Sequence, residues 1–184
     1  MPNWCNNSIT IQGPVDTIRQ LWEDARSGED SGLLQAMAPM PAELNDTVAD
    51  GSEGENWYNW RVENWGTKWD ISDEGLEFTD NGDGTAMITG WFDSAWAPPI
   101  GAYERFLDDM DNCSLTASYY EPGMDFGGIW DNGVDDYFEN LDARLKQPES
   151  EWDDRFREFE QEYDLLSEEW RFEEEEEMVI DDEA

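Results

Sequence analysis

The sequence predicts an α+β protein in which one antiparallel sheet carries two helices on one face and an acidic amphipathic helix follows. Its segments run in the order strand, helix, hairpin, helix, strand, which is the order of a ferredoxin-like split βαβ fold. The 184 residues include 11 Trp, 8 Phe and 6 Tyr, and rings in this number indicate a packed core. From residue 148 onward, aromatic side chains recur at helical spacing. We therefore divide the chain into a domain at 1–147, with a Trp-rich insertion, and an acidic helix and tail at 148–184.

The first strand and the first helix are marked by their periodicity. Residues 4–11 alternate in polarity and stop at Gly13-Pro14, which predicts a strand. Apolar residues then recur at helical spacing as far as Arg26: Val15, Ile18, Leu21, Trp22 and Ala25. Residues 27–32 are Ser, Gly and acidic residues, which end the helix. Residues 37–44 hold two prolines and predict an irregular loop, and the polar, acidic residues 45–55 lead to the Trp-rich segment 57–69.

The second half of the domain is marked by turn signals. Asn81-Gly82-Asp83-Gly84 lies between the β-prone segments 75–78 and 85–92, which is a strong hairpin signal. Pro98-Pro99 opens a second helix, whose apolar residues share one face: Ile100, Tyr103, Phe106, Leu107 and Met110. Residues 113–120 predict a further strand, and 126–130 and 134–138 predict two shorter ones.

The composition excludes several kinds of chemistry. The chain has no histidine, which rules out Ser-His and Cys-His nucleophile pairs and disfavours a zinc site. Cys5 and Cys113 are better explained as small buried hydrophobes than as a disulfide. No segment resembles a signal peptide or a membrane span, so we expect a cytoplasmic protein of the host cell. We accordingly expect no catalytic residue, no metal and no cofactor.

The C-terminal segment carries an aromatic stripe. Its members are spaced by alternating steps of four and three: Trp152, Phe156, Phe159, Tyr163, Leu166 and Trp170. Two interpretations remain open at this point. The stripe either packs on its own domain or forms a homodimer seam or partner-binding face.

Acidic residues dominate both parts of the chain. The chain has 47 acidic and 10 basic residues, a net charge of −37; residues 148–184 contribute 18 and 3 of these. A helix over 151–169 would place a carboxylate about every 3 Å of its axis, against one phosphate per ~1.7 Å of duplex DNA. The acids expected to bind a partner are Asp153, Asp154, Glu158, Glu160, Glu162, Glu168 and Glu169.

Four sequence blocks carry a family resemblance. They are residues 1–7 (MPNWCNN), 57–70 (WYNWRVENWGTKWD), 92–99 (FDSAWAPP) and 119–124 (YYEPGM). These blocks resemble the YubB/Api92-like ferredoxin-like family of bacteriophages and conjugative plasmids over roughly residues 1–138. The resemblance implies a ferredoxin-like fold and an origin on a mobile element. It implies no catalytic residues, and the acidic tail lies beyond it.

Charge and resemblance together suggest a phage- or plasmid-encoded DNA mimic that fills the basic groove of a host defence or other DNA-binding protein. The alternative is a non-enzymatic interaction module that uses its Trp-rich surface or tail helix, with the acidity reflecting solubility or a halophilic host. Direct nucleic-acid binding is disfavoured, because Arg61 and Lys68 are the only cations near the Trp-rich segment. The acidic run at 80–85 lacks the ligand spacing of a calcium loop and fits a hairpin better.

Overall fold

The computed structural model describes residues 2–27, 31–49 and 54–166, and it confirms an α+β protein built on an antiparallel sheet. The sheet has six strands in the order β2-β3-β1-β4-β5-β6. The strands are β1 (Trp4–Pro14), β2 (Leu76–Asp80), β3 (Thr85–Ala95), β4 (Ser114–Glu121), β5 (Phe126–Asp131) and β6 (Val134–Glu139). The helices are α1 (Val15–Asp24), α2 (Leu33–Met37), α3 (Trp57–Asn64), α4 (Ile100–Asp109), α5 (Leu141–Leu145) and α6 (Asp154–Tyr163). Two short 3-10 turns, η1 (Ala42–Leu44) and η2 (Glu149–Glu151), complete the described elements.

β1 lies at the centre of the sheet, as its alternating sequence predicts. It pairs antiparallel with β3 on one side and with β4 on the other. Successive side chains of a strand point to opposite faces, so Cys5, Ile9 and Ile11 are buried on one face while Ser8 and Thr10 lie on the other. Burial raises the pKa of the Cys5 thiol to about 12, so this cysteine behaves as a small core residue.

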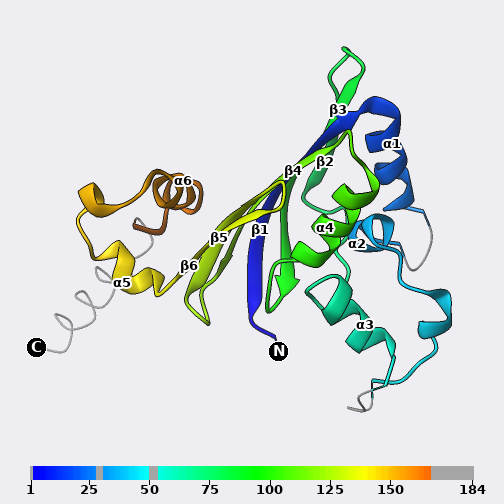
Figure 1. Cartoon of the computed structure of the whole chain (residues 1–184), viewed down its shortest axis with the longest axis horizontal. Coiled ribbons are helices and arrows are strands. Elements are labelled where there is room, and N and C mark those ends of the chain that lie inside the picture. The colour runs from blue at the N-terminus through cyan, green and yellow to red at the C-terminus, as the bar shows by residue number, and fades with distance from the viewer. Residues whose placement is uncertain (1, 28–30, 50–53, 167–184) are drawn as a thin grey trace, which may run out of the picture.

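The first face of the sheet holds the larger core. α1 packs on β1 and β3, and α4 packs on β4, which confirms the two predicted helices. Figure 1 shows α1, α2, α3 and α4 together on this side of the sheet. Trp65, Trp130 and Tyr103 are fully or almost fully buried in this core, together with Ile11 and Leu115.

The insertion is more ordered than its composition predicts. The side chain of Asn56 accepts hydrogen bonds from the backbone N–H groups of Tyr58 and Asn59, and so caps the start of α3. Asp70 accepts from the N–H groups of Leu34 at 2.8 Å and Gln35 at 2.9 Å, and thereby ties the start of α2 to the end of the Trp-rich segment. The expectation of an irregular loop over residues 37–44 was therefore wrong at η1, and α2 and α3 are helices that the sequence analysis did not predict.

The second face of the sheet carries a smaller, aromatic core. α5 and α6 lie beside β5 and β6, opposite to α1 and α4 (Figure 1). The buried residues are Ile129, Phe138, Leu141, Trp152, Phe156, Phe159 and Leu165. The two predicted helices, α1 and α4, share one face of the sheet, and the predicted C-terminal helix α6 packs with α5 on the other.

Candidate functional site

α6 is shorter than the helix that the sequence predicts for residues 151–169. The side chain of Asp153 caps it by accepting a hydrogen bond of 2.9 Å from the backbone N–H of Phe156. Asp164 ends it in a left-handed conformation with φ of 50°. The ten residues Asp154–Tyr163 span about 15 Å at ~1.5 Å per residue, so the described part of the tail does not form one long acidic rod.

The aromatic stripe faces the protein's own sheet. Trp152, Phe156 and Phe159 are buried, and Tyr163 and Leu166 are half-buried. The fit at Phe159 is close, because a Cβ atom on Gly127 of β5 would stand 2.3 Å from Phe159 Cζ. Of the two interpretations, docking on its own domain therefore describes these residues, and the seam interpretation does not. Trp170 lies outside the described residues.

The first three predicted partner-binding acids have arginine partners. Asp153 forms an ion pair with Arg144 of α5. Asp154 lies 3.0 Å from Arg157, one turn along α6. Glu158 lies 3.0 Å from Arg155, whose guanidinium also contacts Asp131 and Asp136 at 3.1 Å each. Asp153 therefore links α6 to α5, and Arg155 links α6 to β5 and β6, whereas Asp154 and Glu158 pair within α6. Part of the charge of these carboxylates is offset locally.

The next two acids also make contacts within the fold. The carboxylate of Glu162 accepts hydrogen bonds from the hydroxyls of Ser8 in β1 and Ser118 in β4. Glu160 accepts one of 3.4 Å from the N–H of Leu166. Glu168 and Glu169 lie outside the described residues. The structure thus brings Asp153, Asp154, Glu158, Glu160 and Glu162 onto one helix, but it does not bring them together as one unpaired acidic row.

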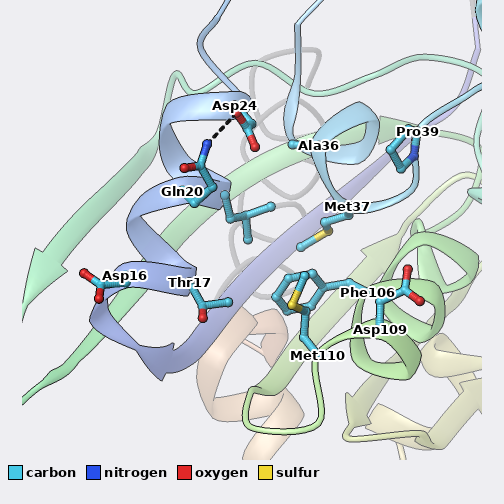
Figure 2. Close-up of a pocket in the computed structure, with 11 residues that line it drawn as sticks. Asp16, Thr17, Gln20, Asp24, Ala36, Met37, Pro39, Phe106, Asp109 and Met110 are labelled. Atoms are coloured by element: carbon cyan, nitrogen blue, oxygen red, sulfur yellow. Dashed lines mark hydrogen bonds between the residues drawn. The ribbon is translucent and has the colours of Figure 1, made fainter.

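A groove between α1, α2 and α4 is acidic at its rim, and the sequence interpretation missed it (Figure 2). It encloses about 500 Å³. Apolar side chains line it, and they include Met37, Phe106 and Met110; its three ionisable lining residues are Asp16, Asp24 and Asp109. No lysine or arginine lines it among the described residues. Its acidic residues and its Phe106 and Met110 lie on the two predicted helices, but the sequence could not show that α2 brings these side chains together into a groove.

The cationic side chains are held by the protein itself. Arg19 and Arg26 each lie 2.8 Å from a carboxylate, Asp80 and Asp73 respectively. The Lys68 ammonium lies 3.8 Å from the ring centre of Trp69. Arg61 lies over the ring of Trp65, and Arg105 donates a hydrogen bond to the side-chain oxygen of Asn64. Arg144, Arg155 and Arg157 form ion pairs with carboxylates. The carboxylates of the surface therefore greatly outnumber the positive charges that could screen them.

The acidic run at residues 80–85 is a turn, as expected. Asp80 accepts a hydrogen bond of 2.9 Å from the N–H of Gly82, and Asp83 accepts one of 3.0 Å from that of Thr85. The Thr85 hydroxyl bonds to Asp83 as well and lowers the pKa of its carboxyl. No cluster of three or more metal-ligating side chains occurs within residues 2–27, 31–49 and 54–166.

Fold and surface together define an α+β protein with a six-stranded antiparallel sheet and a strongly acidic exterior. A solved structure with a similar fold is that of the protein Api92 from Yersinia pseudotuberculosis, with 11% sequence identity and a TM-score of 0.47. The match covers 76% of this chain and 98% of that one. No protein-family model and no curated protein matches the chain. Among the described helices, none is long and apolar enough to cross a membrane.

Proposed function

We propose that the chain is a non-enzymatic binding protein whose acidic surface engages the basic surface of a partner protein. The observation that carries this proposal is the arrangement of its cations, which are bound to the protein's own carboxylates and rings. The excess carboxylates then act together on an approaching molecule. Such a surface attracts a basic partner at long range and gives fast association that weakens with salt.

In its narrower form, the proposal is that a phage or plasmid encodes this protein as a DNA mimic. It would occupy the positively charged nucleic-acid groove of a host defence protein or another DNA-binding protein. The net charge of −37 and the Trp-rich blocks that resemble a mobile-element family support this form. Carboxylates can replace phosphates in such a groove because both present oxygen acceptors to arginine.

Capture with DNA competition tests the mimicry. The immobilised chain is exposed to a bacterial lysate, and each captured protein is then challenged with increasing amounts of duplex DNA. We expect DNA-binding proteins on the resin, and we expect duplex DNA to release them because both ligands share one groove. A captured protein that stays bound at saturating DNA contradicts mimicry and leaves only the broader proposal.

Polyglutamate of similar total charge is the matched control for this experiment. A partner that recognises only negative charge will bind both resins equally. A partner that recognises the shape of this protein will prefer the folded chain over polyglutamate and over the chain denatured in urea. Equal capture by all three contradicts a specific binding surface.

The groove between α1, α2 and α4 supports a second function, that of a protein-interaction module. Its apolar floor and acidic rim suit an amphipathic basic segment, since methionine side chains adapt to varied apolar partners. In the capture experiment, a partner that binds in this groove should stay bound when duplex DNA is added. The Met110→Ser substitution should weaken the capture of that partner. Met124→Ser, at an exposed methionine away from the groove, is the control and should leave that capture unchanged.

We also propose that β1, α1, β2, β3, α4 and β4 form a ferredoxin-like split βαβ unit. The strand order β2-β3-β1-β4 supports this assignment, because each helix then connects two strands that flank a third. β5 and β6 extend the sheet beyond β4 and provide the surface on which α6 packs. A cytoplasmic location in the host cell is part of the same proposal.

A further inference from the structure

A second cavity lies at the edge of β3, where β2 no longer pairs with it. β2 pairs with β3 only between Ala86 and Gly90, so residues 91–95 border a cleft with the segment 69–74. The cleft encloses about 480 Å³. Its walls include three indole rings, those of Trp4, Trp69 and Trp91.

These rings are exposed, unlike the tryptophans of the core. Trp4 is 46% exposed, Trp69 39% and Trp91 44%, whereas Trp65 and Trp130 are at most 1% exposed. The rings of Trp4 and Trp69 lie 5.7 Å apart, and Trp91 packs edge-on against Tyr163 of α6 at 5.5 Å. Exposed apolar surface gathered in one cleft marks an interaction site, and tryptophan is among the residue types enriched at such sites.

Every ionisable residue that lines the cleft is acidic. Its ionisable residues are Asp70, Glu74 and Asp93, and no lysine or arginine lines it among the described residues. Asp70 is committed to backbone N–H groups and Asp93 accepts a hydrogen bond from the Asn6 amide, while Glu74 is exposed at the rim. The charge complementarity therefore favours a cationic occupant.

The protein shows that one of these rings accepts a cation. The Lys68 ammonium lies 3.8 Å from the ring centre of Trp69 and 4.2 Å from that of Trp96. These distances lie within the range of a cation–π contact, in which the negative face of the ring attracts positive charge. Lys68 is not among the residues that line the cleft, and no cation–π contact is described for the Trp4 and Trp91 rings.

The β3 backbone adds hydrogen-bond acceptors on the same side. The N–H of Trp91 bonds to Gly75, and the N–H and C=O of Ala95 bond to Thr67, so both residues direct their backbone groups away from β1. Residues two apart in an antiparallel strand direct these groups to the same edge. The C=O of Asp93 therefore points from β3 toward the cleft side, beside its own carboxylate.

We propose that this tryptophan cleft, lined by Trp4, Trp69, Trp91, Glu74 and Asp93, binds an arginine side chain of a basic segment in the partner protein. A guanidinium is planar, so it stacks on an indole ring while its N–H groups reach carboxylate and carbonyl oxygens at the edge. A lysine ammonium can use the charge but not the planar stacking. This inference rests on the proposed function, because it assumes a basic partner.

Binding of acetylated and amidated hexa-arginine and hexa-lysine, measured by calorimetry at about 50 mM salt where charge screening is weak, tests the inference. Both peptides carry the same charge, so the acidic surface attracts them equally. We expect hexa-arginine to bind about fivefold more tightly, because only a guanidinium combines planar stacking on an indole ring with N–H groups that reach oxygens at its edge. Indole N–H signals of Trp4, Trp69 and Trp91 should shift on addition of hexa-arginine, while those of Trp65 and Trp130 stay in place.

Two variants locate the effect. Trp4→Ala and Trp91→Ala should each remove most of the preference for hexa-arginine and leave hexa-lysine binding within about twofold of the unmodified protein. Tyr137→Ala, at a ring that is 53% exposed on β6, is the matched control and should change neither peptide. Trp4 contacts no residue of α6 in the ring pairs described, so its variant remains informative if Trp91→Ala loosens that helix.

The possible failures are distinguishable. If neither peptide binds, the proposed basic partner is wrong and the inference fails with it. If both bind equally and the tryptophan variants have no effect, the tryptophan cleft is not an arginine site, although an acidic binding surface remains. A preference for arginine that survives both variants also overturns the inference, because the stacking then occurs elsewhere.

Discussion

The Phe159→Ala substitution removes the ring through which α6 contacts the sheet most closely. Phe159 is fully buried and packs against the rings of Tyr120, Phe138, Phe156 and Tyr163. Removing a fully buried phenylalanine ring costs about 3–5 kcal/mol, from lost burial and from the cavity that remains. Small domains unfold with about 5–15 kcal/mol in total, so this one change should remove a large share of the stability.

Urea unfolding measures this loss. With a slope of about 2 kcal/mol per molar urea, a loss of 4 kcal/mol lowers the midpoint by about 2 M. Met124→Ala is the control, because Met124 is 71% exposed and a surface change of this kind costs at most about 0.5 kcal/mol. Far-UV circular dichroism and tryptophan fluorescence should report the same midpoint if the sheet and α6 unfold together.

Two results would refute the reasoning. A destabilisation below about 1 kcal/mol would mean that the ring is not packed as described. A loss that grows with dilution would mean that the aromatic stripe joins two copies of the chain, since the stability of a dimer depends on protein concentration. We expect the same free-energy difference at concentrations a hundredfold apart.

Three further predictions follow from the described contacts. Asp70→Ala should lower the free energy of unfolding by about 3 kcal/mol in urea titrations, because the backbone N–H groups of Leu34 and Gln35 at the start of α2 lose their acceptor. A loss under about 1 kcal/mol would mean that Asp70 does not stabilise the start of α2. The midpoint should rise as the pH falls from neutral to just above the ordinary aspartate pKa of about 3.9. Burial raises the folded-state pKa of Asp70 and Asp135, so the folded state binds these protons more tightly than the unfolded state does. The pKa of Asp153 is lowered mainly by the Phe156 N–H, so its contribution to stability is lost only at lower pH. A urea midpoint that falls as the pH is lowered over this range would contradict this prediction. The chain should stay folded in 50 mM salt, and collapse of its circular dichroism below molar salt would instead support a halophilic origin for the acidity.

Local patterns were sufficient to predict most of the sheet. Alternation marked β1, the Asn81-Gly82-Asp83-Gly84 turn marked β2 and β3, and the turn at 131–133 separated β5 from β6. These signals succeed because strand alternation and turn chemistry act between near neighbours. α1 and α4 followed from apolar spacing for the same reason.

The missed elements depend on contacts that are distant in sequence or on weak local signals. α3 buries none of its residues, so it lacks the apolar stripe that would predict it, although Asn56 is a suitable cap. The end of α6 at Asp164 lacks the glycine that usually accompanies a left-handed helix end. The division between core and exposed tryptophans also depends on tertiary packing, which composition cannot give.

The predicted acidic site shows the same limit in electrostatic form. Sequence spacing placed Asp153, Asp154 and Glu158 on one helix, and this placement agrees with the structure. It could not show that Arg144 lies opposite Asp153, or that Arg155 binds two carboxylates of β5 and β6 besides Glu158. These arginines reduce the repulsion between carboxylates where α6 packs against α5, β5 and β6.

This selective pairing bears on the origin of the charge. Solubility of a small domain needs a net charge of only about 2–8, far below the magnitude of 37 found here. Four arginines offset carboxylates between different parts of the fold, as Arg26 does with Asp73 and Arg155 does with Asp131 and Asp136. The groove rim of Asp16, Asp24 and Asp109 has no cation among its lining residues. Repulsion is thus relieved at internal contacts and retained at the groove between α1, α2 and α4, and this distribution suits the basic partner proposed above.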